Sequence, residues 1–116
     1  TPTCSNQHMP GYVQHAASIR EKGVDTIVCV SVNDAFVMDA WGKDQGAGGN
    51  IMVVGDGNGE FTKAIGLEMD GSGFGLGTRS LRYSMIVRDG VVDTLNIESN
   101  PGEAVDSGAE NLMSQL

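Results

Sequence analysis

The sequence predicts an α/β domain in which helices cover a parallel sheet. Two runs of apolar, mostly β-branched residues, 26–32 and 51–54, carry this prediction, because strands covered on both faces are apolar throughout rather than alternating. Segments with helical character alternate with these runs over short connections, which favours parallel pairing. A chain of 116 residues fits one such domain with a single core.

The first helix is expected over residues 9–22, where apolar side chains recur at helical spacing and Lys22-Gly23 provides a stop. Pro10-Gly11 lies inside this pattern and is expected to kink or delay the helix, because proline has no amide hydrogen to donate. The apolar run that follows is interpreted as the central strand of the sheet.

Shorter elements are expected in the middle of the chain. Asn33-Asp34 is suited to cap a helix that ends near Trp41, ahead of the glycine-rich residues 42–49. The second apolar run is another buried strand, and residues 60–67 are weakly helical. Residues 69–80 contain glycines and serines without regular periodicity, so we interpret them as a functional or mobile loop.

The last part of the chain predicts a β-hairpin and a helix. Residues 81–88 and 91–98 flank Asp89-Gly90, a strong hairpin signal, and residues 104–116 fit a terminal helix. The predicted order thus begins with a helix that has no strand before it, and we expect at least one strand upstream of Thr1. The sequence shows no initiator methionine, signal peptide or transit segment, in agreement with that expectation.

Charge and hydropathy argue against two classes of partner. Fifteen acidic and seven basic residues give a formal net charge of −8, whereas binding to a phosphate backbone needs clustered lysine and arginine. No apolar run approaches the roughly 20 residues that span a bilayer. We therefore expect a soluble protein that binds neither nucleic acid nor membrane.

The two cysteines, Cys4 and Cys29, form neither a CxxC pair nor a zinc-ligand set with His8 and His15. No metal is expected, and so little cysteine favours a reducing compartment, with the cytoplasm as the first expectation. Cys4 stands at the start of the predicted helix, where unpaired amides and the helix dipole favour the thiolate. It is a candidate nucleophile, and the alternative is an inert small apolar side chain.

Several motifs resemble one family. Thr1-x-x-Cys4 resembles the second half of the peroxiredoxin active-site motif, and the continuation CSNQHMPGY at 4–12 is similar to the type II, or peroxiredoxin five-like, subfamily. Further similar stretches are VSVNDAFVM at 30–38, AWGK at 40–43, DGNGEF at 56–61 and RSLRYSM at 79–85.

This resemblance covers the chain almost from end to end. It implies a thioredoxin-like three-layer fold, with a central mixed sheet flanked by helices and a C-terminal β-hairpin and helix. It also implies that residues 1–116 are a single redoxin domain lacking its first strands, roughly its N-terminal third.

The resemblance further implies a thiol peroxidase that reduces hydrogen peroxide and alkyl hydroperoxides without a metal or organic cofactor. Cys4 would attack the peroxide and become a sulfenic acid. The Thr1 hydroxyl would hydrogen-bond the thiolate and peroxide, and Arg82 would lower the thiol pKa and stabilise the breaking bond. Composition alone does not select Arg82 over Arg79 or Arg88.

Each residue also has a structural alternative: Thr1 as a helix cap, and Arg82 as a surface cation on an edge strand. His8, four residues after Cys4, either senses the thiolate or is a partly buried structural histidine. Phe36, Met38, Trp41 and Phe74 form either an exposed patch or ordinary core. By resemblance we expect a homodimer.

Cys29 bears on how the enzyme is recycled. Some plant-like members of the subfamily have a cysteine at this place that is proposed to resolve the sulfenic acid, but its apolar strand favours a buried thiol. Animal members carry a resolving cysteine before the last helix, where this chain has Val105-Asp106-Ser107. An external thiol, glutaredoxin with glutathione or thioredoxin, is therefore the expected reductant.

Two rival functions stay open. A disulfide reductase is disfavoured because Cys4 has no CxxC partner. A non-catalytic peroxide sensor or interaction module on the same fold would be oxidised without turnover. An organellar location is the alternative to the cytoplasm, since a targeting segment would precede Thr1.

Overall fold

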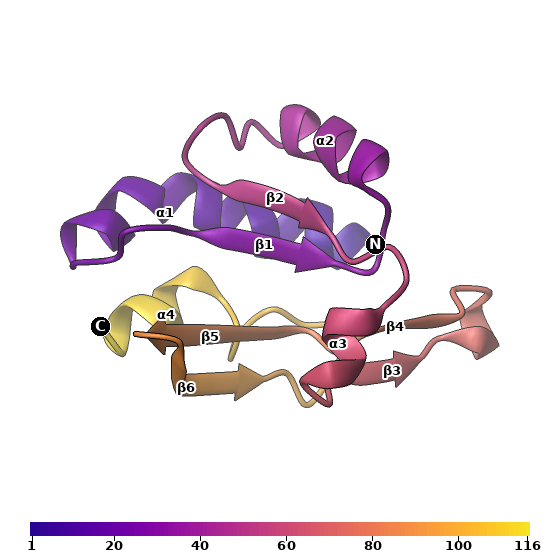
Figure 1. The fold of residues 1–116 in the computed structure, drawn as a ribbon. Coiled ribbons are helices and arrows are strands. Elements are labelled where there is room, and N and C mark those ends of the chain that lie inside the picture. Colours follow the sequence, from indigo (N-terminus) through magenta and orange to yellow (C-terminus); the bar gives the residue numbers. More distant parts are fainter. The chain divides into compact units, whose positions relative to one another are not determined.

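The computed structural model describes residues 1–116, which divide into two compact units (Figure 1). One unit comprises residues 1–25 together with 82–116, and the other comprises residues 26–81. None of the helices combines the length and apolar character that a membrane-spanning segment requires.

The first unit begins with a continuous helix that changes from π-helical to α-helical hydrogen bonding. A π-helical turn, η1 (Cys4–His8), runs directly into α1 (Met9–Glu21), and the Met9 amide closes the wide turn on the Cys4 carbonyl. The α1 bounds agree with the predicted 9–22. Pro10 does not end the helix, but it lies just after the π-helical turn, so the hydrogen-bonding pattern changes next to the place where a kink or delay was predicted.

The predicted hairpin is confirmed. Strands β5 (Tyr83–Arg88) and β6 (Val91–Ile97) pair antiparallel, and both turn residues have positive φ, 51° at Asp89 and 77° at Gly90. Such values are typical of the tight turn whose twist matches a hairpin. Pairing continues one step beyond the strands, because the Glu98 amide donates to the Arg82 carbonyl at 2.9 Å.

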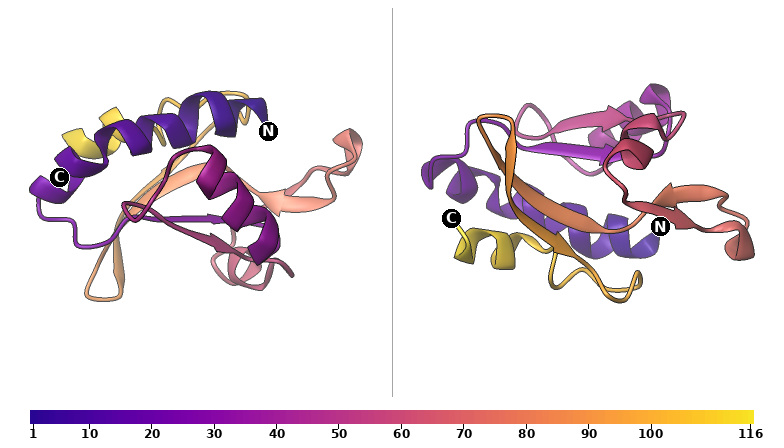
Figure 2. Two further views of the ribbon diagram at one scale, coloured as in Figure 1. Left: turned by 90° about the horizontal axis from the view of Figure 1, so that it is seen from above. Right: turned by 60° about the horizontal axis from the view of Figure 1, so that its bottom comes forward.

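The terminal helix is shorter than expected. Helix α4 covers Ala109–Ser114 and lies alongside α1 (Figure 2), with Ala109 and Leu112 buried. Residues 104–108 are not helical, because the carboxylate of Glu98 binds three successive amides there. The core of this unit consists of apolar side chains from α1, β5 and α4: Met9, Ala16, Ile19, Ile86, Ala109 and Leu112.

The second unit contains the parallel pair that the sequence predicted. Strand β1 (Val28–Ser31) pairs with β2 (Met52–Gly55), with Cys29 opposite Val53. Between them lies α2 (Ala35–Asp44), which Asp34 caps as predicted by accepting the Val37 amide at 2.8 Å. A short helix, α3 (Glu60–Ala64), follows β2.

The strands pair as three separate two-stranded sheets, one parallel and two antiparallel. The interpretation of 26–32 as a central strand is therefore not matched, since β1 has one paired neighbour and its Val28 is 52% exposed. β-Branched residues favour an extended backbone whatever the number of neighbouring strands, so composition alone does not show whether a strand lies at the centre or at the edge of a sheet.

The predicted loop at 69–80 is wrong. Strands β3 (Glu68–Asp70) and β4 (Thr78–Ser80) pair antiparallel around a 3₁₀ turn, η2 (Ser72–Phe74), and the Gly71 amide donates to the Gly77 carbonyl. These strands are polar, so they lack the apolar alternation that marks a strand in sequence. Glycines with positive φ make the connection instead.

Of the four residues of the predicted apolar patch, Met38 is buried at 1% exposure and Trp41 is half-buried. Phe36 and Phe74 are 87% and 88% exposed. Both expectations for this group are therefore met in part, because its members divide between the core and the surface.

Candidate active site

Cys4 and Thr1 are brought together by the first helical turn. The Thr1 carbonyl accepts the Ser5 amide at 3.1 Å, which closes a turn and places residues three apart on one face. The Thr1 hydroxyl then donates to the Cys4 Sγ at 3.1 Å, and the Cys4 amide approaches the same hydroxyl oxygen at 3.5 Å. The half-buried thiol therefore has a hydroxyl donor supplied by its own turn.

Arg82 reaches the same sulfur from the start of the hairpin. Its Nη1 donates to the Cys4 Sγ at 3.2 Å, and its Nη2 makes a longer contact of 3.4 Å with the Pro101 carbonyl. The Arg82 main chain is held by the Glu98 amide, so the side chain leaves the backbone from a paired position. Its Nε is buried and has no hydrogen-bond partner, so the two Nη groups alone orient the guanidinium.

Burial and these two donors act on the thiol in opposite directions. Burial raises the pKa of Cys4, whereas the hydrogen bonds from Thr1 and Arg82 and the charge of Arg82 lower it, and the net pKa lies below that of an ordinary thiol. Hydrogen bonds to the charged form and a nearby cation both favour the thiolate. The site therefore favours the thiolate form of a half-buried sulfur.

His8 contacts the same nitrogen of the Arg82 guanidinium that donates to the sulfur. Arg82 Nη1 lies 3.2 Å from His8 Nδ1, and His8 Nε2 lies 3.1 Å from the Ser107 carbonyl oxygen. Because a guanidinium only donates and a carbonyl only accepts, Nδ1 accepts and Nε2 carries the proton. Burial, and then the charge of Arg82, lower the pKa of His8, whereas the Ser107 carbonyl and Glu98 raise it, and the net pKa is lowered.

The Ser107 carbonyl is held in turn by a buried carboxylate. Glu98 is 6% exposed and accepts the amides of Val105, Asp106 and Ser107 together with the Ser107 hydroxyl, at 2.6 to 3.2 Å. The Tyr12 hydroxyl also donates to the Ser107 carbonyl at 2.7 Å. Sequence reasoning missed Glu98 and Ser107 as parts of this site, because a glutamate at a strand end gives no signal that it is buried.

The structure thus brings together Thr1, Cys4 and Arg82 and adds His8 to them. Cys29 lies in the other unit, half-buried on β1. Arg79, the alternative to Arg82, has a different setting: it donates to the carbonyls of Leu76 and Val32 and to Asn33 at 2.8 to 3.1 Å, and so ties two segments of the second unit together.

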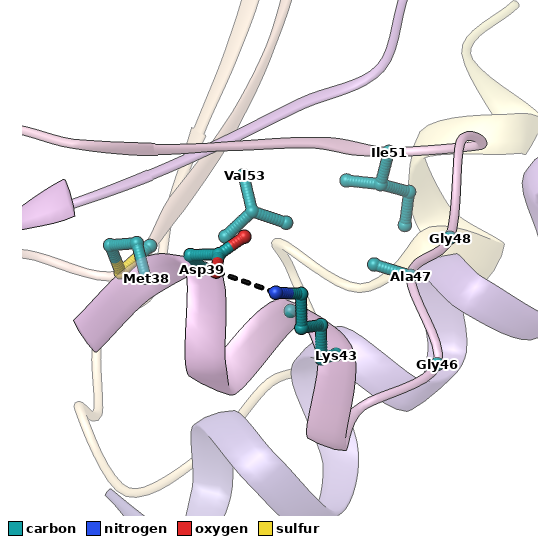
Figure 3. Close-up of a pocket in the computed structure, with 9 residues that line it drawn as sticks. Met38, Asp39, Lys43, Gly46, Ala47, Gly48, Ile51 and Val53 are labelled. Carbon is teal, nitrogen blue, oxygen red and sulfur yellow. Dashed lines mark hydrogen bonds and ion pairs between the residues drawn. The ribbon is translucent and has the colours of Figure 1, made fainter. Parts of the chain in front are cut away.

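The second unit also contains a hollow of about 500 Å³ (Figure 3). It is lined by glycines and by Met38, Ala47, Ile51 and Val53, with the ion pair of Lys43 and Asp39 at 2.9 Å on its side. No cysteine or histidine lines it. No group of three or more His, Cys, Asp or Glu side chains in the structure could hold a metal ion. The candidate reactive group is the Cys4 thiol, to which Thr1 and Arg82 donate.

The model of the redoxin family matches residues 1–113. The chain is 50% identical over 118 residues to chloroplastic peroxiredoxin-2E of Arabidopsis thaliana, and the match covers all of this chain and 50% of that protein. It is 45% identical over 116 residues to peroxiredoxin-2B of the same plant, and this match covers all of this chain and 71% of that protein. The chain thus spans about half the length of peroxiredoxin-2E.

Among solved structures, reduced Prx3 in complex with H2O2 from Vibrio vulnificus superposes with a TM-score of 0.93 at 53% identity. The match covers all of this chain and 74% of that one. The thioredoxin-like fold implied by the sequence motifs is confirmed by this similarity.

Proposed function

Because this chain belongs to the redoxin family and, within it, to the peroxiredoxins, we propose that it is a thiol-dependent peroxidase that reduces hydroperoxides at Cys4. The observation that carries the proposal is the pair of hydrogen bonds that Thr1 and Arg82 donate to one sulfur, at 3.1 and 3.2 Å. A solved relative is described as a complex with H2O2, which supports hydrogen peroxide as a substrate.

In the proposed first step the Cys4 thiolate attacks the peroxide oxygen that carries the hydrogen. An S–O bond forms and the O–O bond breaks, so the sulfur is oxidised to a sulfenic acid and the peroxide is reduced. The second oxygen leaves as hydroxide or alkoxide and takes a proton from solvent, giving water or an alcohol. Two electrons pass from sulfur to the peroxide, so no metal or organic cofactor is needed.

Thr1 and Arg82 are proposed to serve this step with donors already in place. The single hydroxyl hydrogen of Thr1 points at the sulfur, and a bound peroxide would compete for it or accept it. The two Nη1 hydrogens of Arg82 serve Cys4 and His8, and the longer Pro101 contact uses one of the two Nη2 hydrogens. One Nη2 hydrogen is then left to stabilise the oxygen that leaves.

Recycling is proposed to use an external thiol. One thiol displaces water from the sulfenic acid to form a mixed disulfide, and a second thiol releases Cys4 and carries away the disulfide. Glutaredoxin with glutathione, or thioredoxin, supplies such thiols. The half-buried place of Cys29 on β1, and the absence of cysteine from residues 105–107, support this route over an internal resolving cysteine.

The test of the proposed function is capture of the sulfenic acid combined with turnover. One equivalent of hydrogen peroxide should make Cys4 reactive to a dimedone-type probe, detected by mass spectrometry on the Cys4 peptide. Glutaredoxin and glutathione should then sustain peroxide consumption, and Cys4→Ser should abolish both signals. Oxidation of Cys4 without turnover by any external thiol would instead identify a peroxide sensor.

The assembly and the location stay proposals. We propose a homodimer, which sedimentation of the reduced protein tests directly. Two similar relatives are named chloroplastic, so an organellar location is proposed beside the cytoplasmic one. Fluorescent tagging of the protein in its own cells separates the two.

A further inference from the structure

The donors of Arg82 are divided between two acceptors at one nitrogen. Nη1 carries two hydrogens, and it lies 3.2 Å from the Cys4 Sγ and 3.2 Å from the His8 Nδ1. One hydrogen therefore points at each acceptor. Because the guanidinium is planar, fixing one of these two directions fixes the other. The His8 ring nitrogen thus determines where the second N–H points.

His8 can hold that position only as a neutral ring in one tautomer. The Ser107 carbonyl accepts the Nε2 hydrogen, which leaves the Nδ1 lone pair for Arg82. The charged and titratable groups that face His8 are Tyr12 from α1, and Arg82 and Glu98 from the ends of the hairpin. Cys4 binds the same Nη1 of Arg82 as His8 does. A proton on Nδ1 would turn the acceptor into a second donor opposite a cation.

These contacts close a ring that begins and ends at Arg82. The Glu98 amide holds the Arg82 carbonyl, and the Glu98 carboxylate holds the amide and hydroxyl of Ser107. The Ser107 carbonyl holds His8, and His8 holds the Arg82 guanidinium. Glu98, a buried residue, therefore holds the main chain of Arg82 directly and its side chain through Ser107 and His8.

We propose that His8 is a positioning residue, which keeps the Arg82 guanidinium oriented toward the Cys4 sulfur through its Nδ1 acceptor. This inference rests on the proposed peroxidase function, in which Arg82 serves the thiolate and the departing oxygen. A neutral acceptor suits the task because it orients the cation without cancelling its charge, whereas a carboxylate would compete with the thiolate for that charge.

Two substitutions separate positioning from simple packing. In His8→Asn the side-chain Oδ1 lies near the place of Nδ1, so an acceptor for Arg82 is kept and the bond to Ser107 is lost. In His8→Gln the longer side chain reaches the place of Nε2, so the bond to Ser107 is kept and the acceptor for Arg82 is lost. His15→Gln on α1 is the matched control for exchange of a histidine.

The first readout is the pKa of Cys4, which is measured from the thiolate absorbance and from the alkylation rate as functions of pH. Positioning predicts that His8→Gln raises this pKa, while His8→Asn and His15→Gln leave it near that of the unchanged protein. It also predicts that the rate of Cys4 oxidation by peroxide falls about 10-fold in His8→Gln, the effect of one hydrogen bond to a charged group.

The second readout is the pH profile of Cys4 oxidation. Protonation of His8 should impose a loss of rate on the acid side that His8→Asn lacks. The positioning role is overturned if His8→Gln has the same Cys4 pKa and oxidation rate as the unchanged protein. It is also overturned if the oxidation rate falls more in His8→Asn than in His8→Gln, because His8 would then serve through a structural bond to Ser107. If the pKa pattern holds but neither glutaredoxin with glutathione nor thioredoxin sustains turnover, the positioning role stands and the proposed function fails.

Discussion

The guanidinium of Arg82 donates a hydrogen bond to the Sγ of Cys4 at 3.2 Å, although 78 residues separate the two in sequence. This contact places a permanent cation and an N–H donor against a half-buried sulfur. Burial by itself raises the pKa of the thiol, and the donors from Thr1 and Arg82 reverse that effect. The lowered pKa of the Cys4 thiol therefore depends in part on a side chain that lies far from it in the sequence.

Arg82→Ala is expected to raise the pKa of Cys4 and to slow its oxidation by peroxide by about 100-fold, the effect of losing one donor to the transition state. Stopped-flow measurement of Cys4 oxidation against pH gives both quantities. Arg88→Ala is the control, because Arg88 is an exposed cation of the same hairpin that pairs with Asp93 at 3.2 Å. A rate for Arg82→Ala equal to that of the control would remove Arg82 from the site.

Thr1→Val keeps the shape of the side chain and removes its hydroxyl, so the thiolate loses a donor at 3.1 Å. The pKa of Cys4 is expected to rise and the rate of peroxide reduction to fall by about 10-fold or more. Thr1→Ser restores the hydroxyl and should recover most of the rate. Equal rates of peroxide reduction in Thr1→Val and Thr1→Ser would mean that the hydroxyl does not assist the reaction.

Cys29→Ser should leave peroxide turnover driven by glutaredoxin largely unchanged, because Cys29 is half-buried on β1 and the proposed resolving thiol is external. The measurement is the steady-state rate of peroxide consumption, with glutaredoxin and with thioredoxin in separate assays. Loss of turnover with every external thiol tested would assign the resolving role to Cys29.

Glu98→Gln is expected to lower the free energy of unfolding by about 2 kcal/mol at neutral pH. The substitution removes the charge from a buried carboxylate that accepts three amides and a hydroxyl. Denaturant unfolding measures the change, and Glu103→Gln on the exposed loop nearby is the control. If both variants unfold at the same denaturant concentration, the carboxylate contributes little.

The pH dependence of stability gives Glu98 a second test. Burial raises the pKa of Glu98, but the hydrogen bonds from Ser107, Asp106 and Val105 lower it by more than burial raises it. The pKa of Glu98 in the folded state therefore lies below its pKa in the unfolded state. The folded state thus binds this proton more weakly, and the stabilisation is present above the unfolded pKa and lost as pH falls through the folded pKa. Glu98→Gln should lack this part of the acid-side loss of stability.

Local signals in the sequence predicted several elements well. The first helix, the Asp34 cap, the β1–β2 pair and the Asp89-Gly90 hairpin were all expected, because capping, apolar spacing and turn chemistry act over a few residues. The polar strands β3 and β4 were missed. Their pairing depends on a partner strand and on glycine conformations rather than on their own composition.

By itself the sequence determined that a cysteine lies at the start of a helix with a hydroxyl one turn before it, since Thr1 and Cys4 share a turn. Resemblance, rather than periodicity, selected Arg82 among the arginines. Only the tertiary structure decided that Arg82 meets His8, and that Glu98 folds residues 105–107 around its carboxylate. Hydrogen bonds depend on distance in space, and a single sequence carries no measure of the distance between residues that lie far apart along it.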